Sequence, residues 1–102
     1  MTGILHIVLV TFATTATGDD RAAIREGLRC LGEAIPEIVS LEEGESISTE
    51  GLEDGFEYAF AMRFESASDR DEYLSHPMHQ EFGGVLGGCV DRIAVFDLPT
   101  RA

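Results

Sequence analysis

The amino-acid sequence predicts an α+β domain in which helices cover one face of a four-stranded antiparallel sheet. Apolar residues alternate or run together in four strand-like stretches, and two other regions repeat apolar residues at helical spacing. The elements follow one another as β-α-β-β-α-β, which is typical of the ferredoxin-like arrangement. The 102 residues fit one domain, residues 1–102, and leave no room for a second.

The first predicted strand spans residues 4–12, which read ILHIVLVTF. One face of this strand would carry Ile4, His6, Val8, Val10 and Phe12. The other face would carry Leu5, Ile7, Leu9 and Thr11. Because both faces are largely apolar, we expect both to be covered in the folded protein.

A helix is predicted after the break at TATGDD. Thr17, with Asp20 three residues later, resembles a capping box at the helix start. Pro36 ends the helix because proline cannot continue it. The apolar stripe of an amphipathic helix is then formed by Ile24, Leu28, Leu31 and Ile35.

The middle of the chain predicts a pair of strands joined by a polar loop. Residues 38–47 begin as a strand and become acidic, which suits an edge or a protruding end. The polar loop reads STEGLEDG. Residues 56–64 alternate strictly, and their apolar face carries Phe56, Tyr58, Phe60, Met62 and Phe64.

The second helical region and the last strand complete the pattern. Ser68 with Asp71 fits a helix start, and Pro77 indicates that a second helical segment begins near His76. Residues 92–98 form the last predicted strand, which Pro99 stops. Four glycines weaken the second helical segment by about 1 kcal/mol each. They indicate either a close backbone approach or a thin wall over a ligand site, and they are Gly83, Gly84, Gly87 and Gly88.

Charge and composition exclude several classes of protein. The net charge of -12 disfavours binding to nucleic acid and to anionic membranes. No apolar run reaches membrane-spanning length, and the N-terminus lacks the features of a signal peptide, so a cytoplasmic protein is expected. Cys30 and Cys89 are too few for a disulfide framework, and reduced, largely buried thiols are expected.

The apolar character of both strand faces also predicts an association surface. Two helices can cover one face of the sheet, and the other face would be bare in a monomer. We therefore expect a symmetric homodimer in which two sheets pack face to face.

The stretch YLSHPMHQEF holds the candidate chemical residues. His79 leads an otherwise small and apolar stripe and is either a satisfied core residue or the polar group of a pocket. His76 precedes a proline and is expected to cap the helix start. His6 interrupts an apolar strand face, so its ring needs a hydrogen-bond partner. The three histidines could also meet one zinc ion, but no carboxylate stands at ligand spacing, and no metal is predicted.

Several stretches together resemble the stress-responsive dimeric α/β-barrel (Dabb) family. They are HIVLVTF, IPEIVSLEEG, FESASDRDEYLSHPMHQEF and IAVFDL, and the motif Tyr-x-x-His-Pro-x-His followed by Phe is quite specific. The resemblance implies a ferredoxin-like, dimeric α/β barrel. By resemblance to a polyketide cyclase of the family, His79 is the general base of an aldol closure, Tyr73 holds the substrate carbonyl, and His6 lies in the pocket.

The resemblance also implies which residues line the pocket. Cyclase aromatics of the first helix and of the glycine-rich helix correspond here to Arg25, Leu28 and Val90, which points to a different substrate. The apolar lining is expected from Val8, Val10, Phe60, Phe82, Leu86, Ile93 and Val95.

Two functions follow from these residues. The first is a small cofactor-independent enzyme, a polyketide cyclase or lyase acting next to a carbonyl on an apolar, polyketide-like or aromatic molecule. The alternative is a non-catalytic dimer that binds a small apolar ligand or serves in a stress response.

Overall fold

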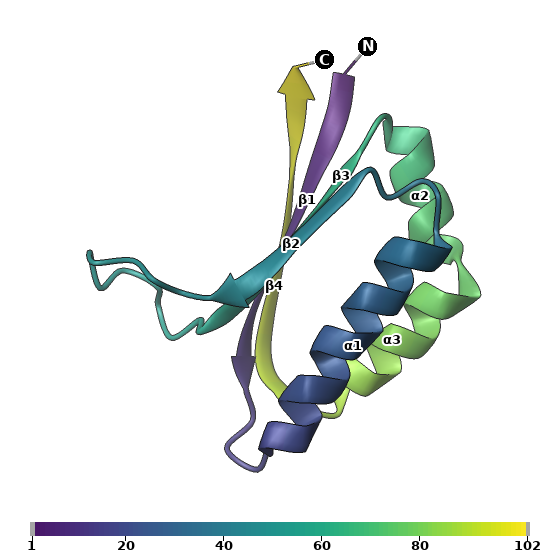
Figure 1. Ribbon diagram of the computed structural model, residues 1–102. Helices are drawn as coiled ribbons and strands as arrows, with labels where there is room; N and C mark the ends of the chain where they lie inside the picture. Colours follow the sequence, from purple (N-terminus) through teal and green to yellow (C-terminus); the bar gives the residue numbers. More distant parts are fainter. Residues whose placement is uncertain (1, 102) are drawn as a thin grey trace.

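A four-stranded antiparallel sheet with helices on one face forms the body of the protein (Figure 1). The computed structural model describes residues 2–101. The strands lie in the order β2-β3-β1-β4, so β1 and β3 are central and β2 and β4 form the edges. The elements are β1 (Thr2–Phe12), α1 (Gly18–Ala34), β2 (Ser40–Glu45), β3 (Tyr58–Phe64), α2 (Ala67–Ser75), α3 (Pro77–Gly87) and β4 (Val90–Arg101). The predicted ferredoxin-like α+β fold is confirmed, with the second helical region divided into α2 and α3.

The two faces of the sheet differ as the alternation in β1 predicts. The inner face packs against the helices and buries His6, Val8, Val10 and Phe12. From β3 it adds Tyr58, Phe60, Met62 and Phe64, all buried. The outer face carries the intervening apolar residues Leu5, Ile7 and Leu9 of β1 and, by strand register, Ala59, Ala61, Ala94, Phe96 and Leu98. Phe96 on this face is 63% exposed.

Helix α1 begins and ends as its sequence predicts. The Asp20 amide donates to the Thr17 hydroxyl (3.1 Å), and the Thr17 amide donates to the Asp20 carboxylate (2.9 Å), which completes the capping box. The helix ends at Ala34, two residues before Pro36. Gly27 lets α1 approach α3 closely, because a Cβ atom there would lie 2.7 Å from Cδ1 of Phe82.

The predicted start of α2 at Ser68 and Asp71 is wrong. Ser66 is the capping residue, and its hydroxyl accepts a hydrogen bond from the Asp69 amide (3.1 Å). Both serines have an aspartate three residues later, so the same signal occurs twice in the sequence. The second segment begins where predicted, since His76 caps α3 by accepting from the Met78 amide through Nδ1 (3.1 Å).

The strand ends differ from the sequence expectation. Pro99 does not stop β4, which continues to Arg101. Because β4 is an edge strand bonded only to β1, one side of its backbone needs no partner, and a proline is tolerated there. β2 is shorter than the expected 38–47, and β3 starts two residues later than the expected 56.

Two further observations bear on the sequence expectations. Within the described residues, no helix is both long and apolar enough to cross a membrane. Neither cysteine forms a disulfide there, and Cys89 is buried while Cys30 is partly exposed.

Candidate active site

A cavity of about 470 Å³ lies between the inner face of the sheet and helices α2 and α3. Its volume falls within the usual range for small-molecule sites, roughly 300 to 1,000 Å³. Most of its lining is apolar, and its polar groups gather around β1, β4 and the α2–α3 bend. The lining residues are His6, Val8, Phe60, Tyr73, Leu74, His79, Phe82, Gly83, Leu86, Gly87, Val90, Ile93, Val95 and Asp97.

The bend between α2 and α3 brings Tyr73 and His79 together. Tyr73 lies in the last part of α2, and His79 in the first turn of α3. His76 between the two helices has an extended backbone, which bends the chain between α2 and α3. As a result the two rings lie with their centroids 4.6 Å apart, and both border the cavity.

One hydrogen bond fixes the tautomer of neutral His79. Nδ1 of His79 lies 3.0 Å from the Leu74 carbonyl oxygen. A carbonyl can only accept, so Nδ1 carries the hydrogen and donates it. The other ring nitrogen, Nε2, then holds the free electron pair of the neutral imidazole. This is the arrangement that a general base requires.

Tyr73 is held as a protonated phenol. Its side chain is 1% exposed, and burial alone raises its pKa above the ordinary value. Within residues 2–101, no fully buried side-chain nitrogen or oxygen lacks a hydrogen-bond partner. Since none of the hydrogen bonds there involves the Tyr73 hydroxyl, its oxygen must reach open space, which the cavity supplies. The hydroxyl is therefore free to donate a hydrogen bond to a molecule that enters the cavity.

The raised pKa values of the tyrosines predict a distinctive alkaline titration. The chain contains two tyrosines, and the pKa of Tyr58 is also raised, mainly by burial and further by its hydrogen bond to Glu43. We expect phenolate absorbance to appear only as the protein unfolds. An unfolded tyrosine ionises near pH 10, so stability is retained below about pH 10 and lost above it, by about 2.7 kcal/mol per pH unit for two groups. Phenolate absorbance with a midpoint near pH 10, while circular dichroism remains native, would contradict this expectation.

His6 forms the second polar centre of the cavity. Its Nδ1 lies 2.6 Å from Oδ1 of Asp97, and the other oxygen of this carboxylate accepts from Arg70 (3.1 Å). His6 is 4% exposed, so the predicted need for a hydrogen-bond partner is met by a carboxylate. The centroid of the His6 ring lies 6.0 Å from that of the Tyr73 ring. The cavity therefore has two neighbouring polar centres, the Tyr73–His79 pair and the His6–Asp97 pair.

Asp97 and Leu74 are site residues that the sequence reasoning missed. Asp97 lies directly opposite His6 in the β1–β4 pairing, 91 positions along the chain. Alternation from Ile93 and Val95 would have placed Asp97 on the inner face, but only the strand register reveals its partner. Leu74 contributes a backbone carbonyl, for which a sequence carries no signal.

Most of the expected lining residues border the cavity, but Val10, Leu28 and Arg25 do not. Val10 and Leu28 are completely buried in the core beyond it. Arg25 lies on the far side of α1, where it pairs with Glu43 of β2 at 3.3 Å. The expectation for these three is therefore corrected. The expected residues that do line the cavity are His6, Val8, Phe60, Phe82, Leu86, Val90, Ile93 and Val95.

The glycines of α3 have two different surroundings. Gly83 and Gly87 border the cavity, whereas Gly84 and Gly88 do not. A Cβ atom at Gly83, Gly84 or Gly87 would meet nothing within 4 Å, so no close backbone approach explains them. At Gly83 and Gly87, therefore, the helix backbone alone borders the cavity, which is one of the two explanations that the sequence indicated.

The three histidines do not assemble a metal site. His76 uses its Nδ1 to cap α3 and is not among the cavity residues. In the part of the chain that the structure describes, no three His, Cys, Asp or Glu side chains lie close enough to hold one ion.

Two proteins of known sequence resemble almost the whole chain. The stress-response A/B barrel domain-containing protein At5g22580 of Arabidopsis thaliana is 35% identical over 101 residues, which cover 98% of this chain and 88% of that protein. Olivetolic acid cyclase of Cannabis sativa is 23% identical over 96 residues, which cover 94% and 95% of the two chains.

Solved structures share the fold. The hydroxynitrile lyase of Passiflora edulis superimposes with a TM-score of 0.90 at 21% identity, over 97% of this chain and 94% of that one. A dimeric ferredoxin-like protein of unknown function from Thermobifida fusca superimposes with a TM-score of 0.82 at 21% identity, over 95% and 90%. The model of the stress responsive A/B barrel domain (Dabb) matches residues 4–100. This protein is therefore a member of the Dabb family, as its sequence motif indicated.

Proposed function

We propose that this protein is a cofactor-independent enzyme that moves a proton next to a carbonyl group, in an aldol-type cyclisation or a lyase reaction. The observation that carries the proposal is the hydrogen bond from Nδ1 of His79 to the Leu74 carbonyl, which leaves Nε2 as the basic nitrogen of a ring whose centroid lies 4.6 Å from that of Tyr73. The similarity to a cyclase and a lyase supports the same class of chemistry.

The proposed reaction begins with proton removal. Nε2 of His79 takes a proton from the carbon next to the substrate carbonyl, and the electron pair of that C–H bond moves toward the carbonyl oxygen. The Tyr73 hydroxyl donates a hydrogen bond to the enolate oxygen that forms. In a cyclisation, the enolate carbon then attacks a second carbonyl carbon of the same molecule. The new alkoxide takes the proton back from imidazolium, so the protein ends unchanged.

The lining indicates the class of substrate. No lysine or arginine is among the cavity residues, so a substrate carboxylate or phosphate would find no opposite charge there. Arg70 is already engaged by Asp97 and Asp71. A neutral molecule with an apolar or aromatic body and a carbonyl at the polar end fits best. His6, held by Asp97, would bind a further polar group of such a substrate.

Deuterium exchange tests the proposal without knowledge of the natural substrate. Phenylacetone, an aryl ketone, is dissolved in deuterated buffer with the protein, and the loss of its α-proton signal is followed by NMR. We expect faster exchange than with free imidazole at the same concentration, because the cavity holds base and donor together. Binding of phenylacetone with no gain in exchange would favour the non-catalytic ligand-binding alternative.

A Tyr73→Phe variant is expected to exchange the α-protons about 10²–10³ times more slowly, because one donor to the developing oxyanion is removed. The phenyl ring keeps its packing against Phe64, whose centroid lies 5.3 Å away. Urea unfolding should therefore remain close to that of the unaltered protein. Exchange at the original rate would contradict the role of Tyr73.

We also propose that the protein is a homodimer. The outer face carries the apolar residues of β1, β3 and β4 named above, and Phe96 at its β4 side is largely exposed. An apolar face of this kind is usually covered by a partner. The dimeric ferredoxin-like protein of T. fusca shares the fold. Two outer faces packed together would form an isologous interface.

A further inference from the structure

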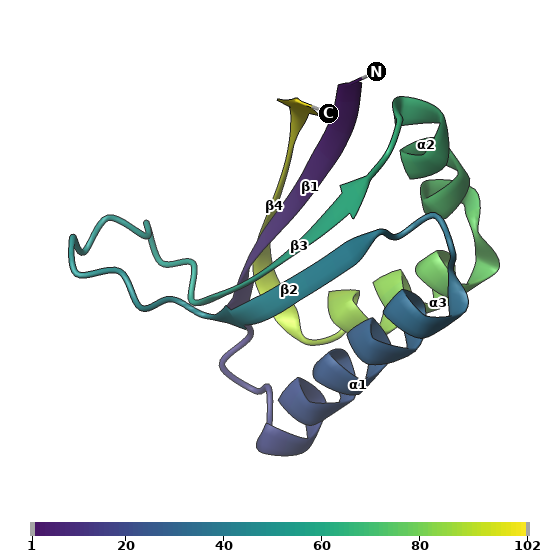
Figure 2. The ribbon, with the colours of Figure 1, turned by 45° about the horizontal axis from the view of Figure 1, so that its top comes forward.

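A long loop stands away from the body of the protein. Residues 46–57, which join β2 to β3, are called the arm here. Figures 1 and 2 show the arm extending from the ends of these strands on the side of the sheet opposite the helices. The arm therefore projects past the outer face, into the space where a second protomer would lie.

The arm is held in a defined shape. At its base, the Thr11 hydroxyl donates to the Gly55 carbonyl (2.7 Å), and Arg92 donates to the Asp54 carbonyl (2.6 Å). Within the arm, the Phe56 amide donates to the Glu53 carbonyl (3.0 Å). These bonds fix the direction of the arm relative to the sheet.

The arm exposes two large apolar side chains. Ile47 is 95% exposed and Leu52 is 78% exposed, so neither is buried by the protomer itself. Burying an isoleucine or leucine side chain stabilises by about 1.5–3 kcal/mol, which gives both residues a reason to meet a partner. Their position on a braced, projecting loop indicates a contact with another molecule.

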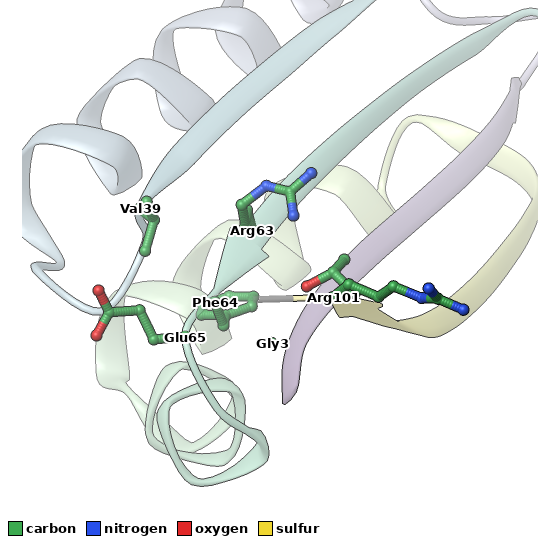
Figure 3. Close-up of a pocket in the computed structure, with 7 residues that line it drawn as sticks. Gly3, Val39, Arg63, Phe64, Glu65 and Arg101 are labelled. Atoms are coloured by element: carbon green, nitrogen blue, oxygen red, sulfur yellow. The ribbon is translucent and has the colours of Figure 1, made fainter. Parts of the chain in front are cut away.

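A hollow of about 370 Å³ lies at the end of the sheet farthest from the arm (Figure 3). Val39 at its rim is 53% exposed. Arg63 extends from the outer face of β3 and makes no ion pair within residues 2–101, in contrast to five other arginines. The hollow is lined by Gly3, Val39, Arg63, Phe64, Glu65, Thr100 and Arg101.

We infer that the arm of one protomer seats on this hollow of its partner, an inference that rests on the proposed homodimer. The exposed side chains of Ile47 and Leu52 complement the exposed Val39, and the acidic arm, with Glu50 among its residues, complements the unpaired Arg63. The arm and the hollow lie at opposite ends of the β2–β3 pair. The arm of one protomer meets the hollow of its partner if the two-fold axis of the dimer lies parallel to the sheets and perpendicular to the strands. The contact then occurs twice per dimer.

Engineered cysteines test this arrangement. In a Cys30→Ser background, Ile47→Cys is combined with Val39→Cys and, in a second protein, with Asp91→Cys. Positions 39 and 47 are separated by about 25 Å along β2, too far for a disulfide within one chain. Asp91 stands at the arm's own end of the sheet and would be reached if the axis ran along the strands.

We expect the 39–47 pair to give covalent dimers on mild oxidation and the 47–91 pair to give none. Cross-linking of the 47–91 pair instead would overturn the inference, and so would a dimeric protein in which neither pair cross-links. If light scattering shows the unaltered protein to be a monomer, the proposed homodimer is contradicted, and the contact between arm and hollow with it.

The apolar contact has its own test. Replacing both Ile47 and Leu52 by serine is expected to raise the dissociation constant of the dimer about 100-fold or more, because two buried side chains are lost. Val85→Ser on α3, which is 43% exposed on the helix side, should leave the constant unchanged. An unchanged constant for the double variant would contradict the seating of the arm.

Discussion

A His79→Gln variant is expected to exchange the α-protons of phenylacetone about 10²–10⁴ times more slowly than the unaltered protein. The glutamine amide can still donate a hydrogen bond to the Leu74 carbonyl, which His79 does through Nδ1 at 3.0 Å. It offers no basic nitrogen in place of Nε2. The variant thus removes the proposed base while it preserves the contact that orders this part of the cavity.

His76→Asn is the matched control. His76 caps α3 by accepting from the Met78 amide, and asparagine is a favoured capping residue with its own acceptor. This variant should keep both its fold and its exchange rate. If His79→Gln exchanged protons at the original rate, or if His76→Asn lost as much, His79 would not be the base.

A Phe64→Ala variant is expected to lose about 3–5 kcal/mol of unfolding free energy in urea. Phe64 is completely buried on β3, and its ring lies 5.3 Å from that of Tyr73 and 6.3 Å from that of His6. The substitution leaves a space under both polar centres of the cavity. A domain of this size is usually stable by about 5–15 kcal/mol, so much of its stability depends on this ring.

Two further variants make the Phe64 measurement interpretable. Phe64→Leu keeps most of the volume and should lose roughly 1 kcal/mol, which gives a folded protein for comparison. Val85→Ala, at a half-exposed position on α3, should change stability by about 0.5 kcal/mol or less. A loss of less than about 1 kcal/mol for Phe64→Ala would show that the core closes over the gap.

Local signals in the sequence predict most of the fold. The alternation in β1, the Thr17–Asp20 capping box and the His76–Pro77 start of α3 each depend on neighbouring residues, and all three are found in the structure. The errors arise where a local signal is ambiguous or depends on position in the sheet. Ser66 and Ser68 carry the same capping pattern, and Pro99 is tolerated because β4 is an edge strand.

The site was harder to predict because it is assembled from distant parts of the chain. Tyr73 and His79 could be proposed together because one short motif carries both, and both border the cavity. Asp97 was missed because its contact with His6 depends on the register of β1 and β4. Val10 has the same apolar character as Val8, and only the depth of packing separates a core residue from one that borders the cavity.

Because Gly83 and Gly87 border the cavity without a side chain, substitutions at these two positions can change its volume. Apart from its chain neighbours and the nearby backbone of α3, a methyl group at either position would meet no atom of the protein within 4 Å, so it would narrow the cavity without displacing the helix. Alanine would also favour the helix by about 1 kcal/mol relative to glycine. Evolution or protein engineering could therefore adapt the cavity to different substrates by one methyl group at a time. Each glycine-to-alanine substitution that narrows the cavity would also stabilise α3.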